Sequence, residues 1–225
     1  MKIKRFVCNP IQENAYVVSE GSSCIIIDPG FDPDTGPESA EFEMLYRYLD
    51  AGNLKPEAIL LTHTHPDHIL GVRSLVERYG IPVYVSGRAS ETLISAQNAL
   101  PWFGDGVSLA GAEIIAVSDG QTLSFGNLSF RAIATPGHTP DSICFYSDSQ
   151  ATLFTGDTLF AGTIGRTDLP GGDYDSEIRS IMEKLIFLPG ETSIFPGHGP
   201  DSTIARERMA NPFLEPFNER EEMDF

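Results

Sequence analysis

Residues 60–71, LLTHTHPDHILG, place four ionisable side chains directly after an apolar run. These side chains are His63, His65, Asp67 and His68, which fall within six residues of one another. Burying such groups without a compensating charge costs on the order of several kcal/mol, so they are not expected to pack against a core by themselves. The stretch therefore predicts a metal site at the end of a buried strand.

The segments around this stretch predict a strand followed by a helix. Residues 57–63, EAILLTH, are typical of a buried strand. A helix is expected to begin near Pro66, because proline suits the first helical turn, and to end at Gly80. The apolar face of this helix consists of Ile69, Val72, Val76 and Tyr79.

The rest of the chain repeats this style of short strands interrupted by helices. Strands are predicted at residues 3–9, 14–19, 23–28, 82–86, 113–118, 121–125, 127–135, 142–147, 151–156 and 192–196. Apolar residues at helical spacing predict helices around residues 42–49 and 178–185. This order favours an α/β fold with two mixed β-sheets flanked by helices over a single βαβ array. No linker or charge block divides the chain, so residues 1–225 are expected to form one domain.

Charge and composition argue against several classes of partner. The net charge is −17, and no basic cluster is larger than KIKR at residues 2–5, which argues against nucleic acid. No apolar run approaches the ~18 residues needed to cross a bilayer, and the start of the chain has no apolar signal region, so no membrane association is expected. The expected partner is a small molecule, and the sequence does not indicate an oligomeric state.

The three cysteines, Cys8, Cys24 and Cys144, form no CxxC pair and lie in apolar or β-branched runs. They are interpreted as buried thiols in strands, since none has a histidine beside it in sequence to activate it as a nucleophile. Unpaired thiols fit a reducing environment, so a cytoplasmic location is expected.

The only other histidines in the chain also follow apolar strands. His138 lies in ATPGHT and His198 in FPGHG, and Asp157 lies in LFTGDT after a similar segment. Side chains at strand ends can meet at one edge of a sheet while the sheet holds the backbone still. Taken alone, a histidine such as His198 is more often a hydrogen-bonded structural residue, and Asp157 is equally a turn residue.

The spacing of the cluster predicts two ions. His63 and His65 are two residues apart, so in an extended chain they project from the same side and can share one ion. Asp67 and His68 come at the turn into the helix, which suits a second ion nearby. The two remaining histidines would each complete one site, and Asp157 could bridge the ions. Imidazole and carboxylate ligands do not separate zinc, iron and manganese, so two divalent ions are expected, with zinc as the first choice.

At this point the chain resembles the metallo-β-lactamase superfamily. THTHPDH at residues 62–68 resembles its H-x-H-x-D-H signature. Four further motifs follow the same order, in IIDPG at 26–30, TPGHT at 135–139, TGDTLF at 155–160 and PGHGP at 196–200. Within the superfamily the chain is most similar to the short bacterial members of the glyoxalase II (hydroxyacylglutathione hydrolase) group of thioester hydrolases.

This resemblance implies a fold and a ligand set. The fold is the αβ/βα four-layer sandwich, with the metal ions at one edge. The implied ligands are His63, His65 and His138 for the first ion, Asp67, His68 and His198 for the second, and Asp157 as the bridge. Asp28, in the first motif, is implied to support the ligands rather than to bind a metal.

The resemblance also implies a reaction. Two adjacent cations lower the pKa of a shared water, so that a metal-bound hydroxide can attack an acyl-thioester such as S-D-lactoylglutathione. No serine, cysteine or other protein side chain is required as the catalytic group.

Arg166, in TIGRTDLPGGD at residues 163–173, resembles the basic residue that contacts glutathione in this family, although a surface arginine in a glycine-rich loop is the alternative. Asp168 and Pro200 stand where the family often has tyrosine. Only 27 residues follow His198, too few for the C-terminal helical domain that completes the glutathione site of longer members. Weak binding of glutathione thioesters is therefore expected.

Two alternatives remain open. The stretch GRTD at residues 165–168 also resembles persulfide dioxygenases of the same superfamily. Those enzymes hold a single iron with residues that match His63, His138 and Asp157. A more distant alternative is a non-catalytic metal-binding or electron-transfer module.

Overall fold

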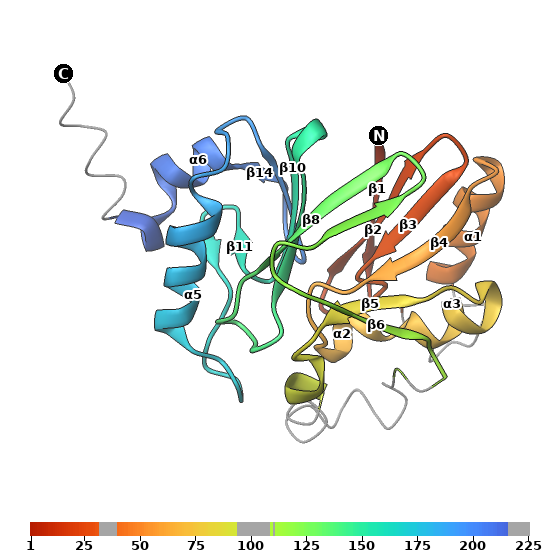
Figure 1. Cartoon of the computed structure of the whole chain (residues 1–225), viewed down its shortest axis with the longest axis horizontal. Helices are drawn as coiled ribbons and strands as arrows, with labels where there is room; N and C mark the ends of the chain where they lie inside the picture. The colour runs from red at the N-terminus through yellow and green to blue at the C-terminus, as the bar shows by residue number, and fades with distance from the viewer. Residues whose placement is uncertain (32–39, 94–108, 110, 216–225) are drawn as a thin grey trace.

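A computed structural model of the chain describes residues 1–31, 40–93, 109 and 111–215 (Figure 1). Its first sheet has the strand order β1-β2-β3-β4-β5-β6, with β1–β3 antiparallel and β3–β6 parallel. The strands are β1 (Lys2–Cys8), β2 (Glu13–Glu20), β3 (Ser23–Ile27), β4 (Lys55–Leu60), β5 (Val83–Ser86) and β6 (Ile114–Val117).

The second sheet has the order β14-β13-β10-β9-β8-β7, in which only β10 and β13 are parallel. Its strands are β7 (Thr122–Phe125), β8 (Leu128–Ala134), β9 (Ile143–Ser147), β10 (Thr152–Gly156), β13 (Ser193–Pro196) and β14 (Ser202–Thr203). A small ribbon pairs β11 (Leu159–Phe160) with β12 (Thr163–Ile164).

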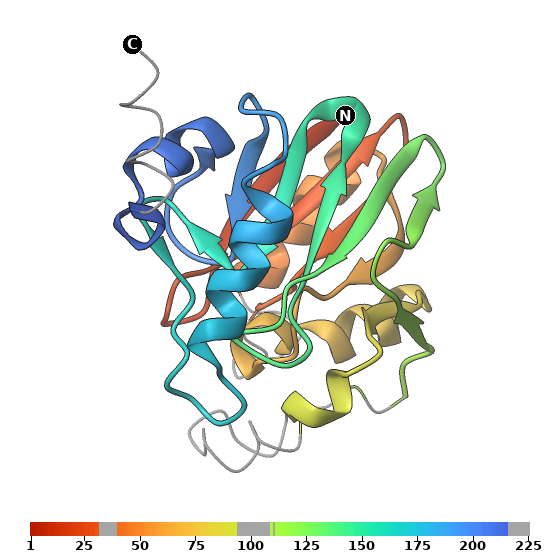
Figure 2. The same cartoon turned by 60° about the vertical axis from the view of Figure 1, so that its left-hand side comes forward.

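Helices cover the outer face of each sheet. Beside the first sheet lie α1 (Ala40–Ala51), α2 (Pro66–Ile69) and α3 (Val72–Tyr79). Beside the second lie α5 (Tyr174–Ser180), the π-helical turn η3 (Ile181–Leu185), α6 (Ile204–Ala210) and the short η4 (Pro212–Leu214), while η2 (Asp148–Gln150) joins two strands. Figure 2 shows α5 and η3 lying across the second sheet. None of the helices in the described part of the chain is long and apolar enough to cross a membrane.

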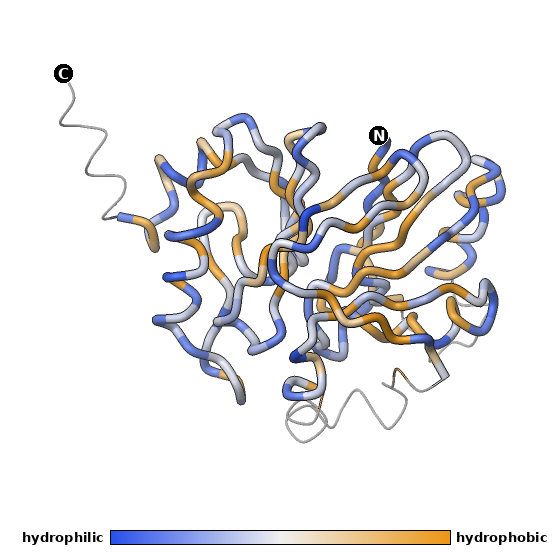
Figure 3. The backbone as a smooth tube through the Cα atoms, in the orientation of Figure 1, coloured by the Kyte–Doolittle hydropathy of each residue, from blue (hydrophilic) through white to orange (hydrophobic). Residues whose placement is uncertain are grey.

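Alternation along the strands builds the layers. In β2, Tyr16 and Val18 are buried between the two sheets, whereas Ala15 and Val17 pack on the side of α1 and α3. A third apolar cluster joins the second sheet to α5, η3 and α6. Hydrophobic segments run along the strands between the helical layers (Figure 3). The predicted αβ/βα four-layer sandwich, with two mixed sheets flanked by helices, is confirmed.

The single helix predicted from Pro66 to Gly80 is wrong, because the structure divides it at Gly71. The Gly71 amide donates to the carbonyl of Pro29 at 2.8 Å, outside the helix. A Cβ at Gly71 would lie 2.8 Å from that same oxygen, so only glycine allows this close approach. In a continuous helix the Gly71 amide would donate to the Asp67 carbonyl. That carbonyl instead accepts a hydrogen bond from Asn9 Nδ2 at 3.0 Å.

The three cysteines are free and buried, in β1, β3 and β9, as predicted. Burial raises the pKa of the Cys24 and Cys144 thiols to about 12. These thiols are therefore protonated at neutral pH, which agrees with a packing role rather than a nucleophilic one.

Candidate metal centre

The seven side chains predicted to bind metal meet in one place, although they come from both sheets. Each follows the end of a strand: the cluster at residues 63–68 follows β4, His138 follows β8, Asp157 follows β10 and His198 follows β13. All are buried except His198 and Asp157, which are partly buried. The two sheets thus bring together candidate ligands that are far apart in sequence.

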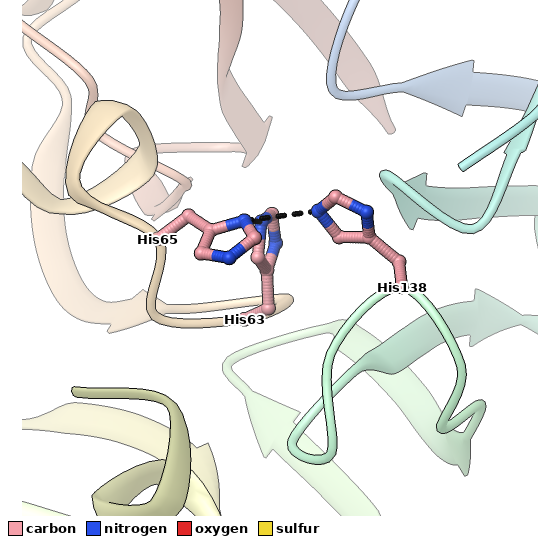
Figure 4. A group of neighbouring side chains, drawn as sticks. All are labelled: His63, His65 and His138. Atoms are coloured by element: carbon pink, nitrogen blue, oxygen red, sulfur yellow. Dashed lines mark hydrogen bonds between the residues drawn. The ribbon is translucent and has the colours of Figure 1, made fainter. Parts of the chain in front are cut away.

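Three imidazole nitrogens form the first group. His65 Nδ1 lies 3.1 Å from His63 Nε2 and 2.9 Å from His138 Nε2. In Figure 4 the three rings point toward one another from two separate segments of the chain. Their nitrogens lie close enough together to share one ion.

The second group adds a carboxylate to two imidazoles. Asp67 Oδ2 lies 3.4 Å from His68 Nε2 and 3.2 Å from His198 Nε2. These atoms also lie close enough together for one ion.

Asp157 lies between the two groups. Its Oδ1 is 3.4 Å from His68 Nε2, while its Oδ2 is 3.7 Å from His138 Nε2 and 3.6 Å from His198 Nε2. The carboxylate therefore faces ligands of both groups, which is the position that a bridging residue needs.

Asp28 orients two of the imidazoles, in agreement with the supporting role that was predicted. It has a positive φ of 47° and accepts from Thr62 twice, at Oδ1 from the amide (2.7 Å) and at Oδ2 from the hydroxyl (2.6 Å). Its Oδ2 also accepts from His68 Nδ1 at 3.1 Å. Since the Thr62 proton goes to Asp28, the Thr62 oxygen is left to accept from His63 Nδ1 at 3.1 Å. Both rings thereby keep Nε2 free for a metal.

His138 is held by a different pair of contacts. Its Nδ1 donates to the carbonyl of Arg166 at 2.8 Å, which leaves Nε2 free. Its backbone amide donates to Glu177 Oε2 at 2.8 Å. The loop after β8 is therefore tied both to the loop before α5 and to α5 itself.

The turn that carries His198 is held by β2 of the opposite sheet. The Asn14 amide donates to the Gly197 carbonyl at 2.7 Å. The Asn14 side chain and the Tyr16 hydroxyl donate to the Pro196 carbonyl at 3.0 and 2.7 Å. These bonds join the two sheets at the edge where the ligands meet.

Burial lowers the pKa of His68 and His198, but Asp67 and Asp157 raise it above the usual value. His63, His65 and Asp157, in contrast, are held in the protonation states that suit a cation. Burial lowers the pKa of His65 to about 3 and that of His63 well below its usual value, with repulsion between the neighbouring imidazoles adding to the effect. Burial alone would raise the pKa of Asp157, but His68 and the other imidazoles lower it to about 2. Neutral imidazoles and ionised carboxylates are the forms that bind metal ions.

A further observation indicates that these residues suit metal ions. His68 Nε2 and Asp157 Oδ1 are buried, face each other and have no hydrogen-bond partner. Leaving such atoms unpaired costs ~1–3 kcal/mol each, and a cation between them removes that cost. A donor set of imidazole and carboxylate without thiolate suits zinc, iron or manganese.

Sequence reasoning missed two buried carboxylates beneath the ligands. Glu13 begins β2 and places Oε1 3.8 Å from His68 Nδ1, and burial raises its pKa well above the usual value. Glu177 lies on the same helical face as Ile181 and Leu185, all fully buried. Glu177 could have been singled out from the sequence, because it is an acidic residue on an otherwise apolar helix face. Glu13, the first residue of β2, had no comparable signal.

Asp141 is a third buried carboxylate, and it joins the two halves of the first group. It accepts from the hydroxyls of Thr64 at 2.8 Å and of Thr92. Thr64 separates His63 from His65, and Asp141 itself lies three residues after the third histidine of the group, in the loop after β8. Asp141 therefore connects the loop after β4 to the loop after β8.

Asp141→Ala is expected to lower the free energy of unfolding by about 2 kcal/mol, because buried hydroxyls that lose their acceptor cost ~1–3 kcal/mol. Asp141→Asn should lose less, since its amide oxygen still accepts. Urea denaturation of the metal-free proteins measures both values. Equal stability of Asp141→Ala and the unchanged protein would show that the threonines find other partners.

A cavity of about 450 Å³ opens beside the ligands. Four apolar side chains line it, together with five of the predicted metal ligands and Arg166. The apolar residues are Ile11, Phe160, Ile164 and Leu169. A mainly apolar cavity with a few polar groups is typical of a small-molecule site.

Arg166, the predicted substrate contact, lies in the wall of this cavity. Its side chain is bound to Asp168 by two parallel bonds, from Nε to Oδ1 at 2.8 Å and from Nη2 to Oδ2 at 2.7 Å. Both side chains are largely exposed. The guanidinium is thus near the site but already paired with a carboxylate of the chain itself.

Comparison with known proteins gives a consistent family. The family model described as Metallo-beta-lactamase superfamily matches residues 8–198. The chain is 36% identical to the Bacillus subtilis "Probable metallo-hydrolase YqgX" over 220 residues, which cover 97% of this chain and 100% of that protein. It is 32% identical to the Haemophilus influenzae "Hydroxyacylglutathione hydrolase GloC" over 220 residues, covering 95% and 98% of the two chains.

Solved structures agree. BLEG-1, a B3 metallo-beta-lactamase, has a TM-score of 0.83 and 36% identity, covering 95% of this chain and 99% of that one. TTHA1623 in a di-iron-bound form has a TM-score of 0.80 and 37% identity, with 94% and 100% covered. ETHE1 from Myxococcus xanthus has a TM-score of 0.76 and 26% identity, with 99% and 91% covered. Because the family match spans most of its length and these relatives are covered almost end to end, the chain belongs to the metallo-β-lactamase superfamily.

Proposed function

We propose that this protein is a metal-dependent hydrolase of acyl-thioesters that uses two metal ions. The observation that carries the proposal is the position of Asp157, whose two oxygens face the first and the second group of ligands. A carboxylate placed in this way suits a pair of neighbouring ions better than a single one. The similarity to a protein named hydroxyacylglutathione hydrolase supports the choice of thioesters.

In this proposal each ligand group holds one ion. His63, His65 and His138 would hold the first ion, Asp67, His68 and His198 would hold the second, and Asp157 would contribute to both. When bound, the ions would lower the pKa of a water and polarise the thioester carbonyl. TTHA1623 is a di-iron-bound relative, so iron is a candidate beside zinc and manganese.

The protein itself supplies the orientation of the metal ligands. Hydrogen bonds that the imidazoles donate to Asp28, Thr62 and the Arg166 carbonyl keep the required nitrogens turned toward the ion sites. Among the described residues that line the cavity there is no serine, threonine or cysteine that could act as a hydroxyl or thiol nucleophile. A thiolate leaves readily without a proton, so the reaction does not need a protein acid at the sulfur.

A second candidate is a persulfide dioxygenase with one iron. The similarity to ETHE1 from Myxococcus xanthus favours it, as does the stretch GRTD at residues 165–168. In that case a single ion would use His63, His138 and Asp157, and the second group would have no ion.

Metal analysis combined with two assays separates these functions. Protein purified without added metal is expected to contain about two ions per chain and to hydrolyse thioesters. It is expected to consume no oxygen with glutathione persulfide. One iron per chain together with oxygen uptake, and no thioester hydrolysis, would replace the hydrolase by the dioxygenase.

A further inference from the structure

Glu13 is a buried carboxylate that lies beneath the second ligand group, which consists of Asp67, His68 and His198. Its side chain is fully buried, and in the described part of the chain neither of its oxygens has a hydrogen-bond partner. A buried carboxylate without donors is costly unless positive charge lies nearby. A cation held by the ligands above it would supply that charge.

Glu13 contacts the second group through both its backbone and its side chain. Its backbone pairs with that of His198 in a single antiparallel bridge. Its Oε1 lies 3.8 Å from His68 Nδ1, the ring nitrogen that faces away from the ion site. A Cβ at Gly30 would lie 2.2 Å from Glu13 Oε2 and 2.1 Å from the Asp67 carbonyl oxygen, so glycine at this position leaves room for both oxygens. The carboxylate is thereby held against the ligands of one ion.

The two ligand groups differ in the charge behind their imidazoles. His68 Nδ1 faces two carboxylates, Asp28 at 3.1 Å and Glu13 at 3.8 Å. In the first group, the corresponding nitrogens of His63 and His138 donate to neutral oxygens, a hydroxyl and a backbone carbonyl. A carboxylate behind a ligating imidazole increases the basicity of the ring, and its attraction to a cation is strong in a buried place. Negative charge from outside the ligand set therefore lies directly behind a ligand of the second ion.

We propose that Glu13 is a supporting residue for the second ion, whose carboxylate strengthens binding of that ion through His68 and contributes nothing to the stability of the metal-free protein. This proposal rests on the proposed function, because it requires two ions. A merely structural carboxylate would instead stabilise the metal-free protein and would not distinguish between the ions.

The test measures the two stepwise dissociation constants for zinc, by competition between the metal-free protein and a chelator. In Glu13→Gln, which keeps the size of the side chain, one constant is expected to rise at least about tenfold and the other to change little. The urea midpoint of the metal-free variant should be equal or higher, because the neutral amide replaces a buried carboxylate that has no donor. Constants that stayed the same, or rose by the same factor, would overturn the proposal. A lower midpoint would also overturn it, since the side chain would then stabilise the fold.

Two single-ion backgrounds identify which ion is affected. His65→Ala removes a ligand of the first group only, and His198→Ala removes a ligand of the second group only. Adding Glu13→Gln to His65→Ala should weaken binding of the remaining ion at least about tenfold, whereas adding it to His198→Ala should change little. The reverse pattern would assign Glu13 to the first ion and overturn the proposal.

Glu207→Gln is the matched control, because Glu207 is also a buried carboxylate. It is supplied with donors, accepting from the Gly162 amide at 2.7 Å, from Asn211 Nδ2 at 2.9 Å and from the Ser202 hydroxyl. Glu207→Gln should lower the urea midpoint, because charge-assisted bonds are weakened, and should keep both zinc constants. This is the opposite of the pattern expected for Glu13→Gln. Equal changes of the zinc constants in the two variants would mean that the position of Glu13 is irrelevant, which overturns the proposal.

Hydrolysis is measured separately, on the unchanged protein with S-D-lactoylglutathione. Two bound zinc ions without hydrolysis would overturn the proposed function, while the zinc constants still decide the role of Glu13. Hydrolysis by the unchanged protein, together with unaltered zinc constants in Glu13→Gln, would overturn the role of Glu13 alone.

Discussion

His63→Ala is expected to lose metal and hydrolytic activity together. His63 Nε2 contributes to the first ligand group, and the same residue lies within reach of a group formed with His68 and Asp157. Loss of a residue that merely orients a ligand already costs about 10–100-fold, so loss of the ligand itself should lower kcat/KM by more than about a hundredfold. Elemental analysis and thioester hydrolysis, measured on the same sample, check the two effects.

A control for this variant has to come from another residue type, because all five histidines of the chain lie in the site. Cys24→Ala also shortens a buried side chain, but in β3 within the core between the first sheet and its helices. It should keep both metals and activity. If His63→Ala still hydrolysed thioesters at the original rate, the reaction would take place elsewhere.

Asp157→Asn is expected to weaken binding of both ions. The carboxylate faces both ligand groups, and a neutral amide is a poorer bridge because it has one carbonyl oxygen and no charge. Burial works against the charge, yet the surrounding imidazoles lower the pKa of Asp157 to about 2, so the carboxylate is ionised throughout the neutral range. Removing it should lower the affinity for each ion by more than about tenfold.

Competition with a chelator, followed by metal analysis, measures the two affinities. Asp148→Asn serves as the matched control, since it makes the same chemical change at an exposed position. If Asp157→Asn bound both ions with normal affinity, Asp157 would have only a structural role in the turn after β10. Loss of one ion only would show that the carboxylate belongs to one group and does not bridge.

The ligands and the core elements could be predicted from the sequence because both follow local rules. Short continuous runs of apolar and β-branched residues identify buried strands such as β2 and β3. Polar residues directly after such strands, as at His63, Asp157 and His198, have to lie at a sheet edge. Five motifs in family order then fixed the layer arrangement by resemblance, which the two six-stranded sheets confirm.

Other features were decided only by the tertiary structure, because they depend on residues distant in sequence. The break at Gly71 exists because the Pro29 carbonyl approaches it, and no helical pattern records that contact. Asp141 is recognisable as a link between ligand loops only when Thr64 and Thr92 are seen beside it. Burial of a carboxylate has to be compensated by whatever the fold places nearby, and local sequence does not state what that is.

The ion pair at the cavity lies between these two cases. Arg166 and Asp168 are only two residues apart, and both were singled out from the sequence, yet each was judged separately against the family pattern. Their sequence spacing permits many side-chain directions. Folding of the loop onto His138 turns the guanidinium toward the cavity and the carboxylate toward the guanidinium. The sequence by itself determined the fold and the set of candidate ligands, whereas the charge available to a substrate was decided by the tertiary structure, because that charge depends on which side chains meet.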